Sequence, residues 1–329
     1  MKIAVIGAGN NASGHARRLA AMQDVKVAGI ADPVAEKAAA LAEAVGAKAF
    51  GDHQEMLEQA KPEAVWISSP CWLHAAQTID CARAGAHVMC EKPMALTLED
   101  CDRMIEAAAE NNVKLMIAQS TRYIASLLEL KRILESGRCG ELVSAWSVRM
   151  SYHKVKPGAE WRLDAAKSGG VVMEWEIHEI DFLRSLGGEV NRVYAQTACS
   201  RANAPTFLDN FSGVVSFANG GYGRLEASQS CTLGWGSRGF IGTQGTAIAR
   251  GKEVHLKTVD NEEPETVDTS ADGYITRAFG KPAQDADFVR AIREDDVSPI
   301  TGEDARRNIE IGLAIVASGQ SGQPVTLNV

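Results

Sequence analysis

The stretch "KIAVIGAGNNA", residues 2–12, decides the fold of the first part of this chain. An apolar run at residues 2–6 leads into Gly7 and Gly9, and a helical pattern follows from Ala12. In this G-x-G-x-x-A spacing the first glycine allows a tight turn, the second lets a pyrophosphate approach the backbone, and the small third residue lets the helix pack close to the sheet. The stretch therefore predicts a strand–turn–helix unit that binds a dinucleotide at the helix N-terminus. An ordinary glycine turn is the alternative.

The first 120 residues alternate short apolar runs with helical patterns. Strands are expected at residues 2–6, 25–31, 47–50, 64–68, 87–90 and 113–118. Helices are expected at residues 12–22, 35–45, 54–60, 75–84 and 98–111. This alternation is typical of a parallel sheet with helices on both faces.

The remaining residues follow a different pattern, with longer alternating runs. Strands are expected at residues 142–151, 190–199, 211–217, 222–232 and 324–327, and helices at 124–136, 284–293 and 305–317. Such runs are typical of a mostly antiparallel sheet with one face covered. The predicted fold class is therefore α/β, with a doubly wound parallel sheet in residues 1–120 and an α+β domain bearing a large open sheet in residues 121–329.

The composition excludes several classes of protein. The chain has 329 residues, 45% hydrophobic and 23% charged, which is typical of a globular protein with a proper core. A formal net charge of −8 without any Lys/Arg block argues against nucleic acid as a partner. Seven cysteines without a C-x-x-C pair predict reduced buried thiols rather than disulfides or a zinc site. No apolar run is long enough for a membrane span, so we expect a cytoplasmic protein with no membrane partner.

The end of the second expected strand carries an acidic residue that bears on cofactor choice. Asp32 stands there, where a carboxylate can accept hydrogen bonds from both ribose hydroxyls of NAD. No arginine or serine follows Asp32 to bind a 2′-phosphate, so the sequence favours NAD over NADP. The alternative is a turn residue before Pro33.

Two further strand ends carry polar turns. In an open parallel sheet ligands bind at the carboxyl ends of the strands, and the segments 91–93 (EKP) and 68–70 (SSP) both lie at such ends. Lys92 would then face the cofactor, where a partly desolvated lysine can exchange a proton with a substrate oxygen. A polar turn between strand and helix is the alternative.

A second group of candidate residues lies in "SGGVVMEWEIHEIDFL", residues 168–183. If this segment is helical from about Val172, then Glu174, His178 and Asp181 stand on one face. A histidine oriented by a carboxylate is a suitable general acid or base near neutral pH. The alternatives are a hydrogen-bonded core histidine and solvated carboxylates. A metal is not expected, because neither an H-E-x-x-H motif nor a cysteine partner is present.

Taken together, these segments resemble the glucose–fructose oxidoreductase/inositol dehydrogenase/rhizopine catabolism (Gfo/Idh/MocA) family of NAD(P)-dependent oxidoreductases. The matching pieces are "GAGNNASGH" (7–15), "SSPCWLH" (68–74), "AGAHVMCEKPMALT" (84–97), "AEWRLDAAKSGG" (159–170) and "EWEIHEID" (174–181). A strand followed by EKP and a helix, with H-x-x-D downstream, is more specific than the glycine loop alone.

The resemblance implies a Rossmann domain followed by an open-faced sheet domain that bears the substrate. Lys92 matches the lysine that contacts the reacting hydroxyl, often with a cis bond to Pro93, and His178 matches the histidine that exchanges the proton. Glu174 stands where the family commonly has aspartate, and Glu176 where it commonly has glycine. These two departures bear on the choice of substrate.

The residues expected at the site fall into three groups. The catalytic candidates are Lys92, His178 and Glu174. The cofactor-binding candidates are Gly7, Gly9, Asn10, Asn11, Ala12, Asp32, Ser69, Pro70, His74, Glu91 and Lys92. The substrate-binding candidates are Lys92, Arg122, Tyr152, Trp161, Arg162, Glu174 and His178, and domain packing is the alternative for the aromatic and arginine members.

The resemblance implies hydride transfer between NAD and a secondary alcohol or ketone of a sugar, sugar derivative or cyclitol, in a homodimer or homotetramer. Two rival functions stay open on the same fold. One is a glycosidase that oxidises its substrate only transiently, so that no net NADH forms. The other is a non-catalytic sugar-sensing protein, which would usually lack Lys92 or His178.

Overall fold

A computed structural model of the chain describes residues 1–155, 158–270 and 280–329. The chain forms two compact units, Met1–Gln119 with Lys281–Ile309, and Ser120–Gly280 with Glu310–Val329. These units differ from the predicted ranges 1–120 and 121–329 in the segment Lys281–Ile309, which packs with the first 119 residues. One physical reason is the ring of Phe288, which is fully buried and packs edge-on against Trp66 with centroids 5.3 Å apart.

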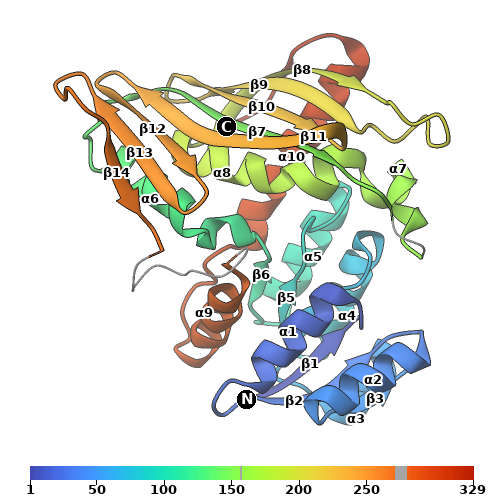
Figure 1. Cartoon of the computed structure of the whole chain (residues 1–329). Helices are drawn as coiled ribbons and strands as arrows, with labels where there is room; N and C mark the ends of the chain where they lie inside the picture. The colour runs from blue at the N-terminus through green and yellow to red at the C-terminus, as the bar shows by residue number, and fades with distance from the viewer. Residues whose placement is uncertain (156–157, 271–279) are drawn as a thin grey trace. The chain divides into compact units, whose positions relative to one another are not determined.

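The first unit is built on a parallel six-stranded sheet (Figure 1). Its strands are β1 (Lys2–Ile6), β2 (Lys26–Ala31), β3 (Lys48–Phe50), β4 (Ala64–Ile67), β5 (His87–Cys90) and β6 (Leu115–Ile117). Its helices are α1 (Asn10–Ala20), α2 (Ala35–Val45), α3 (His53–Ala60), α4 (His74–Arg83), α5 (Leu98–Glu110) and α9 (Lys281–Arg293). The strand order β3-β2-β1-β4-β5-β6 is that of a doubly wound Rossmann sheet, which confirms the predicted fold class.

The sequence explains why these elements form. The central strands are buried on both faces, as the adjacent residues Val88 and Met89 show, because helices cover both sides of a parallel sheet. Helix α5 begins at a capping residue, since the hydroxyl oxygen of Thr97 accepts a hydrogen bond from the Asp100 N–H at 3.1 Å. The polar turn of residues 91–93 therefore lies between the end of β5 at Cys90 and this helix start.

The second unit contains a nine-stranded sheet in the order β14-β13-β12-β11-β7-β10-β9-β8-β15. The strands are β7 (Leu142–Tyr152), β8 (Val190–Ala198), β9 (Asn210–Phe217), β10 (Tyr222–Ser228), β11 (Ser230–Gly242), β12 (Gly245–Arg250), β13 (Glu253–Thr258), β14 (Glu265–Asp268) and β15 (Val325–Thr326). All neighbouring pairs are antiparallel except β7 and β10. The single strand expected at residues 222–232 is in fact the whole of β10 and the start of β11, divided at Gln229.

Helices cover one face of this sheet (Figure 1). They include α6 (Ala125–Glu135), α8 (Ile177–Gly187) and the later part of α10 (Gly302–Ser321), which begins in the first unit and ends in the second. The remaining helical pieces are α7 (Ala165–Ser168), the 3₁₀ turns η2 (Ser120–Tyr123) and η3 (Glu160–Leu163), and the π-helix η4 (Val172–Glu176). Side chains that face these helices, such as Leu225 and Phe240, are buried.

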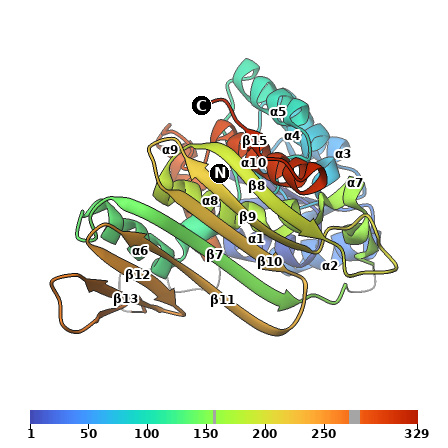
Figure 2. The same cartoon turned by 90° about the horizontal axis from the view of Figure 1, so that it is seen from above.

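The opposite face of the sheet is open, and Figure 2 looks onto it. Exposed apolar side chains on this face include Tyr194, Val214, Tyr222, Trp235 and Ile241. Across the part of the chain that the structure describes, no helix is both long and apolar enough to cross a bilayer.

Candidate functional site

The glycine loop lies between β1 and α1 with the geometry that dinucleotide binding needs. Gly7 has φ +100°, and a Cβ there would lie 2.8 Å from the Ser68 carbonyl oxygen, so only glycine fits this close approach. Gly9 is the N-cap of α1 and is exposed, and a Cβ there would meet nothing within 4 Å. The first N–H groups of α1 therefore receive no side-chain cap from residue 9, and a pyrophosphate can reach them. Asn10 and Asn11 are exposed on this first turn, whereas Ala12 is buried against the sheet.

Asp32 is held beside the glycine loop by backbone hydrogen bonds. Its Oδ2 accepts the Ala8 N–H at 2.7 Å, and its Oδ1 accepts the Val34 N–H at 2.9 Å. Each carboxylate oxygen has a second lone pair, so the half-buried carboxylate can still accept hydroxyl groups. Asp32 is therefore free to act as the ribose acceptor that the sequence predicts, which stays a prediction.

The turns that follow β4 and β5 are joined by His74. Its Nδ1 lies 2.9 Å from the Pro93 carbonyl oxygen and its Nε2 lies 3.0 Å from the Ser69 carbonyl oxygen. Burial lowers the pKa of His74, and a neutral ring carries a single N–H that can donate to only one of these oxygens. The Ser69 hydroxyl donates to Gln77 Oε1 at 2.5 Å, and Pro70 precedes a 3₁₀ turn, η1 (Cys71–Leu73). In the structure His74 therefore lies between two predicted site turns and can donate a hydrogen bond to one of them.

Glu91 and Lys92 stand at the carboxyl end of β5. The Lys92–Pro93 peptide bond is cis. Glu91 is 7% exposed, and its Oε2 accepts the backbone N–H of Lys92 at 3.2 Å. Burial acts to raise the pKa of Glu91, but His15, Lys281 and Lys92 outweigh it and hold the pKa well below its usual range. Glu91 is thus a buried carboxylate that stays ionised beside Lys92.

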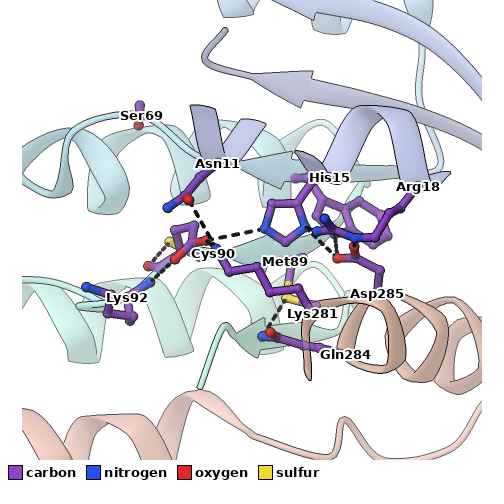
Figure 3. A network of polar contacts seen from close by, with 12 residues as sticks. Asn11, His15, Arg18, Ser69, Met89, Cys90, Lys92, Lys281, Gln284 and Asp285 are labelled. Atoms are coloured by element: carbon purple, nitrogen blue, oxygen red, sulfur yellow. Dashed lines mark hydrogen bonds and ion pairs between the residues drawn. The ribbon is translucent and has the colours of Figure 1, made fainter. Parts of the chain in front are cut away.

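A network of charged side chains around Glu91 was not predicted from the sequence (Figure 3). His15 of α1 lies between Glu91 and Asp285 of α9, with Nε2 3.3 Å from Glu91 Oε1 and Nδ1 2.5 Å from Asp285 Oδ1. Lys281, the first residue of α9, has its Nζ 3.1 Å from Asn11 Oδ1 and 3.4 Å from Glu91 Oε1. His15 lies within the quoted motif "GAGNNASGH", but its partners on α9 are remote in sequence and gave no signal.

The candidate residues predicted on residues 174–181 all belong to the second unit. Their two outer carboxylates, those of Glu174 and Asp181, pair with different arginines. Glu174 is buried in the π-helix η4 and forms an ion pair with Arg162. Asp181 is buried in α8, and Arg122 binds it in a bidentate manner at 2.8 and 2.7 Å. The regular α-helix expected from Val172 is therefore wrong for residues 172–176, where the wider π turn changes the angular spacing between Glu174 and the α-helical residues after it.

The remaining substrate candidates of this group also belong to the second unit. His178 is half-buried on α8, and its carbonyl oxygen accepts a hydrogen bond from the Thr121 hydroxyl at 3.3 Å. The Arg162 guanidinium lies over the Trp161 ring, 4.6 Å from its centroid. Tyr152, at the end of β7, is 61% exposed. Arg162, Trp161 and Glu174 thus come together, whereas Arg122 has the bidentate geometry of a structural ion pair.

A buried carboxylate that sequence reasoning missed anchors α8 to the sheet. Glu179 is fully buried and accepts hydrogen bonds from Arg238 Nε and Nη2, both at 2.6 Å, and from the Ser147 hydroxyl at 2.6 Å. Burial alone would raise the pKa of Glu179, but Arg238 lowers it to about 2. Within residues 1–155, 158–270 and 280–329, no three side chains of His, Cys, Asp or Glu are grouped as ligands for a metal ion.

Comparison with known proteins gives the family of the chain. The protein-family model described as "Oxidoreductase family, NAD-binding Rossmann fold" matches residues 1–119. The family model described as "GFO/IDH/MocA C-terminal domain" matches residues 127–248. A 1,5-anhydro-D-fructose reductase of Ensifer adhaerens is 30% identical over 88% of this chain and 87% of its own length. A myo-inositol 2-dehydrogenase of Thermotoga maritima is 26% identical over 99% of this chain and 98% of its own.

Solved structures show the same fold. A levoglucosan dehydrogenase in complex with NADH and levoglucosan has a TM-score of 0.90 at 23% identity, over 100% of this chain and 100% of that one. The WlbA dehydrogenase of Bordetella pertussis, in complex with NADH and UDP-GlcNAcA, has a TM-score of 0.90 at 25% identity, over 100% of this chain and 98% of that one. The glycine loop, Asp32 and the EKP turn thus occur in a chain that belongs to the Gfo/Idh/MocA family of oxidoreductases, with NAD as its cofactor.

Proposed function

We propose that the protein transfers a hydride between NAD and a secondary alcohol or ketone of a sugar, sugar derivative or cyclitol. The observation that carries the proposal is Lys92, which follows a buried ionised carboxylate at the carboxyl end of β5 in the same unit as the glycine loop. Two relatives that match most of this chain are named as an inositol dehydrogenase and an anhydrofructose reductase, which supports this class of substrate.

The cofactor, when bound, supplies the acceptor or donor of the hydride. The residues of the chain handle the proton. His178 takes the proton from the substrate hydroxyl, and the ammonium group of Lys92 donates a hydrogen bond to the same oxygen. Glu174, held by Arg162, orients the substrate through its carboxylate. In this proposal residues 1–120 bind NAD through the glycine loop, Asp32 and the turns at Ser69 and Glu91, and residues 121–329 bind the substrate.

The aromatic and charged residues near Glu174 suit a polyhydroxylated substrate. The indole ring of Trp161 offers an apolar face for the C–H groups of a sugar ring, and the Arg162–Glu174 pair offers donors and acceptors for its hydroxyl groups. Lys92 and His178 are both present, which favours a catalyst over the sugar-sensing alternative.

An absorbance assay tests the proposal. The purified protein is mixed with NAD or NADP and a panel of cyclitols, aldoses, anhydrosugars, glycosides and sugar acids, and absorbance is followed at the wavelength where the reduced cofactor alone absorbs. We expect net NADH with at least one cyclitol or sugar. Release of an aglycone without net NADH would instead establish the glycosidase, and binding of a sugar without any turnover would establish the sensing protein.

A further inference from the structure

The carboxylate of Glu91 is held in place on both of its oxygens. Its Oε1 lies 3.3 Å from His15 Nε2 and 3.4 Å from Lys281 Nζ, and its Oε2 accepts the backbone N–H of Lys92 at 3.2 Å (Figure 3). A buried carboxylate without such partners would be strongly destabilising. The position of Glu91 therefore determines how the backbone of Lys92 is held.

His15 is itself fixed by a buried partner from the far end of the chain. Asp285 is fully buried, and its Oδ1 lies 2.5 Å from His15 Nδ1. The same carboxylate accepts hydrogen bonds from Arg18 Nε at 2.7 Å and from Trp66 Nε1 at 3.0 Å. These four groups come from α1, β4 and α9, so the contact joins three elements of the first unit.

The protonation state of His15 follows from these neighbours. Arg18 Nη2 lies 3.0 Å from His15 Nδ1, so this ring nitrogen faces a donor as well as the Asp285 oxygen. The shorter distance is to Asp285, which indicates that Nδ1 carries a hydrogen and donates to the carboxylate. Burial acts to lower the pKa of His15, but Asp285 and Glu91 outweigh it and raise the pKa above its ordinary value. An imidazolium donates from both nitrogens at once, which a neutral ring cannot do.

We propose that His15 and Asp285 are positioning residues for Lys92. Asp285 fixes the ring of His15, His15 holds the carboxylate of Glu91, and Glu91 holds the backbone N–H of Lys92. Both residues are almost completely inaccessible, at 1% and 0% exposure, so they act through Glu91 rather than on a ligand. The role of Lys92 in turnover rests on the proposed function. The contacts that link Asp285, His15 and Glu91 to the Lys92 backbone do not depend on it.

The test compares three variants with a matched control. His15→Leu removes both ring donors, and Asp285→Asn keeps nearly the same shape but loses the charge that holds the ring. His15→Gln keeps one N–H for Glu91 and serves as a partial rescue. The control is His53→Leu, because His53 also pairs with an aspartate of the first unit, with its Nε2 2.9 Å from Asp80 Oδ2.

Amide hydrogen exchange reports the positioning directly. We expect the Lys92 amide to exchange about tenfold faster or more in His15→Leu and Asp285→Asn, an intermediate rate in His15→Gln, and the wild-type rate in His53→Leu. With a substrate found by the panel, kcat should fall by about tenfold. The Kd for NAD, measured by calorimetry, should change less than kcat, because the glycine loop and Asp32 also bind NAD in the proposed function.

Each outcome decides the proposal. Unchanged exchange at Lys92 in both His15→Leu and Asp285→Asn would overturn it. Loss of protection throughout β1 and β4 in all three variants would show a general core role and would also overturn it. Faster exchange without a loss of turnover would leave the positioning intact and would count against Lys92 in the proposed reaction, so the two failures are distinguishable.

Discussion

At the scale of single residues, we expect Asp32 to control which cofactor the glycine loop accepts. Its carboxylate, held by the N–H groups of Ala8 and Val34, should repel a 2′-phosphate, so NAD should bind more tightly than NADP. Replacing Asp32 with Ser should weaken NAD binding by about tenfold and reduce the preference over NADP, because hydrogen bonds to a charged group contribute about 1.5–3 kcal/mol.

Fluorescence titration with both cofactors measures this preference. Asp52→Asn is the matched control, since Asp52 also accepts two backbone N–H groups, those of Gln54 and Glu55, as the N-cap of α3. Its affinities should equal those of the wild type. Equal affinity of the unmodified protein for NAD and NADP would contradict the assigned role of Asp32.

Lys92 and His178 carry the proton chemistry in the proposed reaction. Lys92→Ala and His178→Ala should each lower kcat by about 10²-fold or more while NAD binding is retained, because general acid–base groups contribute about that much. Glu174→Gln should fall between these variants and the wild type if the carboxylate only orients the substrate or His178.

Steady-state kinetics on the identified substrate, with Kd for NAD measured separately, checks these values. Lys114→Ala is a suitable control, because Lys114 forms an ion pair with Asp295 at 2.9 Å in the first unit. Near-normal turnover of His178→Ala would remove that residue from the mechanism.

At the scale of elements, Glu179 joins α8 to strands β7 and β11. Replacing Arg238 with Met removes the bidentate partner and leaves a buried carboxylate with the Ser147 hydroxyl and the more distant Arg149 guanidinium, 3.9 Å away. The free energy of unfolding should fall by about 3–5 kcal/mol, and adding Glu179→Gln to that variant should recover part of the loss. Urea unfolding near neutral pH measures both changes.

The same ion pair has a defined pH dependence. The pKa of Glu179 is lowered from 4.5 to about 2 in the folded state, so its contribution is complete above about pH 4.5 and is lost as the pH falls through the folded pKa. The difference in free energy of unfolding between the wild type and Arg238→Met should therefore become smaller as the pH falls from about 4.5 to about 2. A constant difference down to pH 2 would contradict this account.

At the scale of the whole molecule, the open face of the nine-stranded sheet bears on assembly. The structure divides the apolar residues of β9 and β10 between the two faces: Val214 is 41% exposed, whereas Phe217, Leu225 and Ala227 are buried. The exposed apolar side chains of this face, together with the assembly that the family resemblance implies, lead us to expect a homodimer or homotetramer. The alternative is a monomer, and the polar residues on the same strands permit it.

Light scattering at micromolar concentration decides between these states. We expect a mass of at least twice the 35.2 kDa of one chain, and a mass near that value would contradict the prediction. Val214→Glu, in the middle of β9 on the exposed face, should shift the protein towards the monomer. The matched control is Val259→Glu, because Val259 is also exposed, at 69%, but lies beyond the end of β13.

Much of the site could be predicted from sequence because its signals are local. A glycine loop directly follows a strand, Asp32 ends the next strand, and Lys92 ends a third. Turn chemistry and hydrophobic periodicity fix such positions within a few residues. Strands β11 to β14 were largely missed, because segments such as 231–238, "CTLGWGSR", contain glycine and serine in place of a regular apolar alternation, and pairing with neighbouring strands decides their conformation.

The sequence by itself determined the doubly wound sheet, the family and the cofactor, since these depend on motifs of a few residues. Only the tertiary structure decided that α9 packs with the first unit and that Asp285 meets His15 across 270 positions of the chain. It also decided that Arg122 is bound by Asp181 and that Glu174 is paired with Arg162. The physical reason is that a buried charge must find a partner in space, and the partner is selected by packing of whole elements rather than by spacing along the chain.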